Sequence, residues 1–327
     1  MHSYEFSLPT KVMVGIRLLE RSGEVLAGLV SGVNEALDSL RESLEKSGFS
    51  VVSTFSSFGQ NPRVSACQEV VDRLEKEPSD LCIAIGGGST LDAAKWIAKR
   101  AKSDFLATIP TTAGTGSECT EWVLLARDDS DVRESLEGRA ADLAILDASL
   151  TLSMPPTVTL FSGIDAFSHG FEAYISYRSS SLSDLLAIEG CRKLVANLGR
   201  CVANGDDLEA RSAVLEASMF CGLAMRNAGL GVLHCIADVV PGFYPQYPHG
   251  LVCGTLLRKT LEFNQEAMSM AKHVKVFPLV NQAARLFDTY LAQFQLSGIT
   301  IEKEKLDELS RRGRLRPISR QQFALTM

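Results

Sequence analysis

The stretch Asp80-Leu-Cys-Ile-Ala-Ile-Gly-Gly-Gly-Ser-Thr90 determines how the first half of the chain is interpreted. Residues 80–85 form an apolar run of strand length, and a helical pattern over residues 92–102 follows the glycines. A strand, a glycine turn and a helix in this order favour phosphate binding. The glycines let the backbone approach the anion, and the helix N-terminus presents free N–H groups to it. The pattern is not the common Gly-x-Gly-x-x-Gly fingerprint, and a tight turn without a ligand is the competing interpretation.

A second loop of similar character follows the next expected strand, residues 105–109. Its sequence, Pro110-Thr-Thr-Ala-Gly-Thr-Gly-Ser117, is rich in hydroxyls and glycines and suits phosphate or ribose, although turn chemistry alone would also account for it. Further strands are expected as a pair within residues 5–16, at 51–55 and at 143–146, helices at 34–46 and 65–75, and an exposed hairpin or loop at 127–138. Alternating strands and helices predict a parallel α/β sheet.

The segment Thr151-Leu-Ser-Met-Pro-Pro156 interrupts this alternation. We therefore expect an α/β dinucleotide-binding domain over residues 1–150 and an all-α domain over residues 151–327. Helices in the second domain are predicted at residues 164–176, 182–203, 208–227, 229–240 and 252–265, with amphipathic helices beyond them.

The composition narrows the class of protein. The chain has 327 residues, is 46% hydrophobic and carries a net charge of -6, without a basic stripe of the kind that binds nucleic acid. No apolar run approaches the roughly 18 residues of a membrane span. The N-terminus lacks the basic start and apolar run of a signal peptide. The eight cysteines form no Cys-x-x-Cys pair. We therefore expect a cytoplasmic protein with reduced thiols and neither nucleic acid nor membrane as a partner.

Three of the five histidines fall in the segment 163–250, together with an aspartate at helical spacing. Asp165 and His169 are four residues apart, so on a helix they share one face. His234 and His249 follow in glycine-flanked apolar stretches. One carboxylate and three imidazoles suit Zn²⁺ or Fe²⁺ and leave a position open for a substrate oxygen. Histidines satisfied within the core are the alternative, and spacing alone does not decide between the two.

Four motifs resemble those of the iron-containing, or group III, alcohol dehydrogenases, in the same order as in that family. These motifs are Gly86-Gly-Gly-Ser-Thr-Leu-Asp-Ala-Ala-Lys95, Pro110-Thr-Thr-Ala-Gly-Thr-Gly-Ser-Glu118, Asp165-Ala-Phe-Ser-His-Gly-Phe-Glu-Ala-Tyr174 and Pro248-His-Gly250.

The resemblance implies an NAD(P)-dependent alcohol dehydrogenase, a dimer, with its active site between the two domains. It implies that Fe²⁺ or Zn²⁺ is bound by Asp165, His169, His234 and His249. It places the phosphates of NAD or NADP on Gly86, Gly87, Gly88 and Ser89. Thr111, Thr112 and Thr115 would lie near the adenosine half, and Asp92 near the nicotinamide.

Two departures from the family pattern leave alternatives open. Many relatives carry a histidine four residues after the third ligand, where this chain has Asp238, which we treat as a candidate proton acceptor or substrate contact. The connection at 29–33 is also shorter than in relatives. A polyol or maleylacetate-type reductase of the same fold, or a cofactor-binding protein with little turnover, are the alternatives. The sequence does not decide the substrate, NAD against NADP, or iron against zinc.

Overall fold

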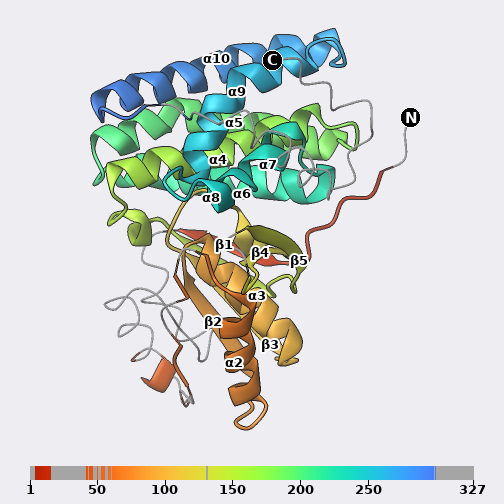
Figure 1. Cartoon of the computed structure of the whole chain (residues 1–327), viewed down its shortest axis with the longest axis vertical. Coiled ribbons are helices and arrows are strands. Elements are labelled where there is room, and N and C mark those ends of the chain that lie inside the picture. Colours follow the sequence, from red (N-terminus) through yellow and green to blue (C-terminus); the bar gives the residue numbers. More distant parts are fainter. Residues whose placement is uncertain are drawn as a thin grey trace.

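The computed structural model describes residues 4–15, 61–129 and 132–297, with isolated residues between 42 and 59 and residue 299. A layer of packed helices from the second half of the chain lies against the end of a parallel sheet from the first half (Figure 1). The predicted fold class, a parallel α/β part followed by a helical part, is confirmed.

The sheet contains β1 (Lys11–Gly15), β2 (Leu81–Gly86), β3 (Phe105–Pro110) and β6 (Leu143–Asp147), in the order β1-β6-β3-β2. All three strand pairs are parallel. The pairing of β2 with β3 runs from Leu81 opposite Phe105 to Gly86 opposite Pro110. The two strands therefore end side by side, and the glycine turn and the threonine-rich loop leave the sheet as neighbours.

Both faces of β2 are buried, which explains its unbroken apolar sequence. Ile83 and Ile85 pack in one cluster with Leu44, and Cys82, which lies between them in sequence, packs with Ala98 on the opposite face. Ala98 belongs to α3 (Gly88–Arg100), and α2 (Val64–Leu74) packs beside α3. The strand at the centre of the predicted phosphate motif is thus held by contacts on both sides.

The helical half contains α4 (Pro156–Ile175), α5 (Ser181–Ala203), α6 (Leu208–Ala228), α9 (His249–Asn264) and α10 (Met270–Gln293), and the short helices α7 (Val232–Ala237) and α8 (Val240–Phe243). Glycines allow α4, α5 and α6 to approach closely. A Cβ on Gly170 or Gly190 would fall 2.6 Å or 2.5 Å from the sulfur of Cys221. All eight cysteines are buried and free, as expected for core thiols.

Three sequence predictions need correction. Within the described part of the segment expected as a strand pair at 5–16, residues 5–15, the only strand is β1. The residues before β1 cross to the helical half, where the backbone N–H of Ser7 donates to Asn227 Oδ1 at 2.7 Å. Residues 53–55 are not a strand. The helix expected at 229–240 is split into α7 and α8 because Pro241 lacks the N–H that a continuous helix needs.

The charged segment expected as a hairpin or loop is the turn and second strand of an antiparallel hairpin, β4 (Trp122–Ala126) with β5 (Arg133–Glu137). Most of the helix expected at 34–46, the connection at 29–33 and residues 51–52 lie outside the described residues.

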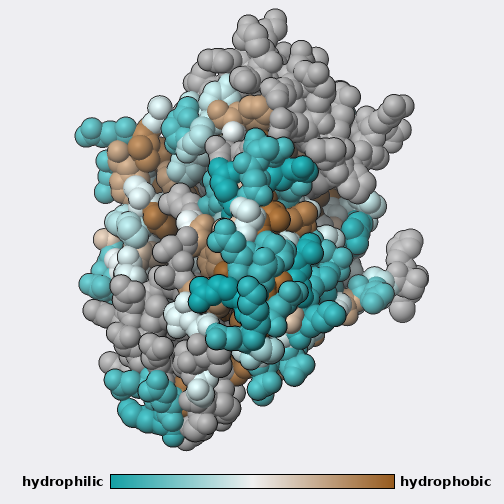
Figure 2. Space-filling model, turned by 60° about the horizontal axis from the view of Figure 1, so that its bottom comes forward, coloured by the Kyte–Doolittle hydropathy of each residue, from teal (hydrophilic) through white to brown (hydrophobic). Residues whose placement is uncertain are grey.

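The face shown in Figure 2 is mainly hydrophilic, with hydrophobic residues in separate small patches. Within the described ranges, no single helix is long and apolar enough to cross a membrane. One bent pair, α6 with the segment Val232–Phe243, meets the length and composition criteria, with an angle of 98° at its break.

A buried lysine ties α3 to the chain that follows the threonine-rich loop. The Lys95 ammonium is fully buried and donates to the carbonyl oxygens of Ser117 at 2.9 Å, Thr120 at 3.2 Å and Trp122 at 2.6 Å. It also lies 3.1 Å from Asp92 Oδ1. The chain from η2 (Ser117–Cys119) to β4 is therefore fixed to α3 by a buried charge.

We expect Lys95→Met to lower the free energy of unfolding by about 3 kcal/mol or more, because it leaves Asp92 and several carbonyl oxygens without their buried partner. Urea unfolding followed by circular dichroism measures this effect. Lys99→Met is the matched control, since Lys99 forms a partly exposed ion pair with Glu137 and its loss should cost less than about 1 kcal/mol. Equal losses in the two variants would contradict this role of Lys95.

Candidate active site

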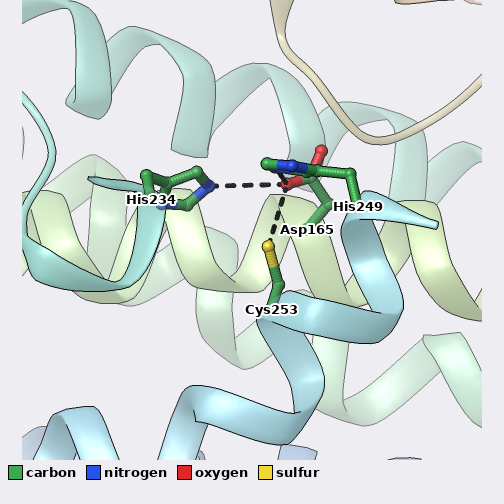
Figure 3. Close-up of side chains that lie close together, drawn as sticks. All are labelled: Asp165, His234, His249 and Cys253. Atoms are coloured by element: carbon green, nitrogen blue, oxygen red, sulfur yellow. Dashed lines mark hydrogen bonds and ion pairs between the residues drawn. The ribbon is translucent and has the colours of Figure 1, made fainter. Parts of the chain in front are cut away.

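The side chains predicted to bind a metal come from three helices and meet at the Asp165 carboxylate. Figure 3 shows Asp165 with His234 and His249. His249 Nε2 lies 3.1 Å from Asp165 Oδ1, and His234 Nε2 lies 3.5 Å from it. His169 Nε2, one turn further along α4, lies 3.7 Å from the same oxygen. The structure thus brings all four predicted ligands together.

The spacing of these atoms fits a metal ion. A tetrahedral zinc with bonds of about 2.0–2.3 Å holds its ligand atoms roughly 3.3–3.8 Å apart. The distances of 3.1, 3.5 and 3.7 Å from Asp165 Oδ1 to the three imidazoles are close to that range. Asp165, His169 and His234 are each more than nine-tenths buried, and one carboxylate with three imidazoles is a donor set for Zn²⁺ or Fe²⁺.

Two of the rings are oriented by hydrogen bonds on their other nitrogen. Glu172 Oε2 lies 2.8 Å from His234 Nδ1, and the same carboxylate accepts from the backbone N–H groups of Leu233 and His234. His249 Nδ1 lies 2.9 Å from the carbonyl oxygen of Ala237. The Arg133 guanidinium lies 3.3 Å from the same nitrogen. Because a carbonyl oxygen accepts and a guanidinium donates, these two contacts do not define a single tautomer of His249. Both rings turn Nε2 toward Asp165, and a metal bound there would take the place of any proton on that nitrogen.

The pKa values of the clustered side chains depend strongly on one another. Burial opposes the ionisation of Asp165, but the imidazoles of His169 and His249 and hydrogen bonds from the rings outweigh it and hold its pKa well below the usual range. Burial lowers the pKa of His169 to about 4. Burial also disfavours the charged form of His249, yet Cys253 and Asp165 raise its pKa to about 10. Protons and a divalent cation therefore compete for the same nitrogens.

Asp238 lies beside the cluster and outside the set of donor atoms. It follows the last residue of α7 and is 8% exposed. Its Oδ1 is 4.0 Å from His249 Nδ1, the ring nitrogen that does not face Asp165. The predicted position one turn after His234 agrees with the hydrogen bond from the Asp238 N–H to the His234 carbonyl oxygen at 3.0 Å. A polar side chain is thus present next to the cluster.

The two predicted cofactor loops are in contact. The N–H of Thr111 donates to the Gly86 carbonyl oxygen at 2.9 Å. A Cβ at Gly88 would fall 2.6 Å from Thr115, so packing alone excludes a side chain there. A Cβ at Gly87 would meet only Thr112, at an ordinary 3.4 Å. Gly87 precedes α3 and no side chain caps the helix, so the positive end of the helix dipole and the space at Gly87 suit a phosphate.

Asp92, predicted to lie near the nicotinamide, is tied into the protein. Its carboxylate accepts from Ser117 Oγ at 2.5 Å and from the Leu124 N–H at 2.9 Å, and it lies next to Lys95. These bonds position the threonine-rich loop, and the contact of Asp92 with the cofactor stays a prediction.

The threonine-rich loop and the start of α9, which carries His249, meet on one turn of α4. A Cβ on Gly114, in the threonine-rich loop, would fall 2.9 Å from the Cβ of Ser162. Gly250, which follows His249, packs so closely on Phe161 that a side chain there would run into its carbonyl oxygen. Phe161 and Ser162 lie one turn before Asp165. The fold therefore places a phosphate-type loop and a metal-type cluster against the same helix.

Two residues of the site were not singled out from the sequence, although the spacing contained the signal. Glu172 lies seven residues after Asp165 on α4, which places both on one helix face. Cys253 lies four residues after His249 on α9, and its Sγ is 3.7 Å from Asp165 Oδ1. A buried cysteine is usually a core residue, so its residue type alone does not indicate a role in the site.

Comparison with known families agrees with this geometry. The family model described as iron-containing alcohol dehydrogenase matches residues 9–148, and the C-terminal model of the Fe-containing alcohol dehydrogenase family matches residues 159–312. The chain belongs to the iron-containing alcohol dehydrogenase family. The resemblance inferred from the motifs is confirmed, and so is the assignment to an oxidoreductase of this family that uses a nicotinamide cofactor.

Individual proteins that the chain is similar to are also dehydrogenases. The chain is 31% identical over 296 residues to choline dehydrogenase of Bacillus subtilis (80% of this chain, 73% of the relative). It is 32% identical over 251 residues to the NAD-dependent methanol dehydrogenase of Bacillus methanolicus (68% and 66%). Among solved structures, an iron-containing alcohol dehydrogenase from Thermotoga maritima has a TM-score of 0.81 at 26% identity, covering 95% of this chain and 92% of that one.

In this protein, we expect Glu172→Gln to lower metal affinity about 10- to 100-fold, because the neutral amide orients His234 less firmly. Isothermal titration with Zn²⁺ measures the change. Glu189→Gln on the exposed side of α5 is the matched control and should bind metal like the unchanged protein. Unaltered affinity in Glu172→Gln would show that the carboxylate is not needed to orient the ring.

Proposed function

We propose that the protein interconverts an alcohol and an aldehyde or ketone, with a divalent metal at Asp165, His169, His234 and His249 and a nicotinamide cofactor on the glycine turn. The observation that carries the proposal is the convergence of four donor side chains beside a phosphate-type loop that packs on the same helix. The dehydrogenase relatives support it, and no comparison favours a cofactor-binding protein without turnover.

The proposed role of each group of residues follows from its position in the fold. Gly86, Gly87, Gly88 and Ser89 would hold the pyrophosphate at the start of α3, with Thr111, Thr112 and Thr115 beside it. When bound, the metal would supply Lewis acidity and the nicotinamide would supply hydride transfer. The buried cluster would exclude water, and Asp238 would accept a proton or a hydrogen bond from a substrate hydroxyl.

Further assignments belong to the same proposal. The boundary near residue 150 is supported by the gap between the two matched family models. The match to the first ends at residue 148, and the match to the second begins at residue 159. A homodimer and a cytoplasmic location, with neither nucleic acid nor membrane as a partner, remain predictions, as do the substrate's identity and the choice between NAD and NADP. A small alcohol is the substrate class that the relatives' names support.

The test of the metal assignment is direct. Purified protein reconstituted with Fe²⁺ or Zn²⁺ should retain about one metal per chain, and His249→Ala should retain almost none and lose NAD-dependent alcohol oxidation. His273→Ala is the control, because His273 lies on α10 against Phe277, away from the cluster. Full metal retention in the double variant His234→Ala and His249→Ala would refute the assignment.

The glycine turn has its own test. We expect Gly87→Ala and then Gly87→Val to weaken NADH binding progressively, because each added carbon occupies the space that the phosphate would need. Fluorescence titration with NADH measures the dissociation constant. Metal content and melting temperature serve as controls, since Gly87 has room for a Cβ and lies outside the cluster. A folded Gly87→Val protein with unchanged NADH affinity would remove the turn from the cofactor site.

We expect Asp238→Ala to shift substrate preference toward less polar alcohols with metal content retained, because it removes an acceptor next to His249. Asp238→His, which restores the commoner family residue, should raise activity on simple aldehydes. The values of kcat/KM for a panel of alcohols and diols measure both effects, and Asp104→Ala, at an exposed site, is the control. Asp238 has no role in the pocket if both variants keep the original profile.

A further inference from the structure

Cys253 projects its sulfur into the metal cluster from α9, one turn after His249 (Figure 3). The thiol donates to Asp165 Oδ1 at 3.7 Å. One ligand atom each from Asp165, His234, His249 and Cys253 lie within 4.8 Å of one another. A carboxylate oxygen, two imidazole nitrogens and a sulfur in this arrangement form a four-donor set of the kind that binds zinc.

His169, by contrast, is less firmly oriented than the other two imidazoles. Glu172 holds the Nδ1 of His234, and the Ala237 carbonyl oxygen holds that of His249. The Nδ1 of His169 is buried and has no hydrogen-bond partner among the described residues. Its ring stacks on His234 with centroids 4.4 Å apart and planes 17° apart. Metal-binding histidines are normally fixed by such a partner, so His169 is the least firmly oriented of the three imidazoles.

The surroundings of Cys253 differ from those of Cys191 and Cys221. Cys191 donates to the Phe167 carbonyl oxygen at 3.7 Å, and Cys221 fills the space beside Gly170 and Gly190. These cysteines serve helix packing. Cys253 is also fully buried, but its sulfur faces a carboxylate and two imidazoles whose Nε2 atoms point into the same space.

We propose that Cys253 binds the metal as a thiolate, in addition to Asp165, His169, His234 and His249. This inference rests on the metal site proposed above. On binding, the S–H bond is replaced by an S–metal bond and the proton leaves to solvent. Thiolate is a soft ligand that favours Zn²⁺ over hard cations such as Mg²⁺ and Ca²⁺. His169 is then the donor whose loss should reduce metal retention least.

The experiment is cobalt substitution. Metal-free full-length protein is titrated with Co²⁺, and near-ultraviolet absorption is recorded for the unchanged chain, Cys253→Ser and Cys201→Ser. Cys201 is an equally buried helical thiol, on α5, and is the matched control. We expect a sulfur-to-cobalt charge-transfer band in the unchanged chain and in Cys201→Ser, and its loss in Cys253→Ser. Metal retention should also fall further in Cys253→Ser than in His169→Ala.

A second measurement needs no variant and covers the case in which Cys253→Ser does not fold. X-ray absorption of the zinc-loaded unchanged protein should contain a Zn–S distance of about 2.3 Å beside the shorter Zn–N and Zn–O distances of about 2.0–2.2 Å. Bound metal with nitrogen and oxygen neighbours alone would overturn the role of Cys253 and leave the proposed function intact. Failure to bind cobalt or zinc at all would overturn the metal site itself, and the thiolate ligand with it.

Discussion

The buried carboxylate of Asp165 is the constraint on which the site depends. An ionised carboxylate out of water is costly unless it is paired, so the fold must bring polar partners to it. Three of these partners are the imidazoles of His169 on α4, His234 on α7 and His249 on α9. A fourth is the thiol of Cys253, also on α9. The cluster accordingly lies where these helices cross and carries positive charge from ring protons or from a cation. Its position in the helical half follows from this electrostatic requirement.

Helix α4 is the common support of both halves of the site. It contributes Asp165 and His169, and Glu172 on the same helix orients His234. The turn that precedes Asp165 receives the threonine-rich loop at Ser162 and the start of α9 at Phe161, in each case through a glycine that has no space for a side chain. Lys95 fixes the far end of that loop to α3. Close packing at these two glycines and the buried Lys95 ammonium therefore fix where the cluster lies relative to the sheet.

Much of this arrangement was predictable from local patterns. The i, i+4 spacing gave the shared face of Asp165 and His169, and the apolar run before the glycine turn gave β2. Features that depend on tertiary contacts were missed. The apolar and polar residues before β1 resemble a strand, yet their polar groups bond to Asn227 in the helical half. Cysteine is a residue type that is usually buried in the core, and Cys253 has polar neighbours only because α9 crosses α4.

Glu172 links local folding to the chemistry of the cluster. Helix α7 spans only Val232–Ala237, too short to be stable by itself in water, and two of its first N–H groups are satisfied by the same carboxylate that holds the His234 ring. Order in this helix and the tautomer of the ring therefore rest on one side chain. By thermodynamic reciprocity, an ion that fixes the ring also protects the backbone amides of the helix from exchange with solvent. The cation and the secondary structure beside it are in this sense a single cooperative unit.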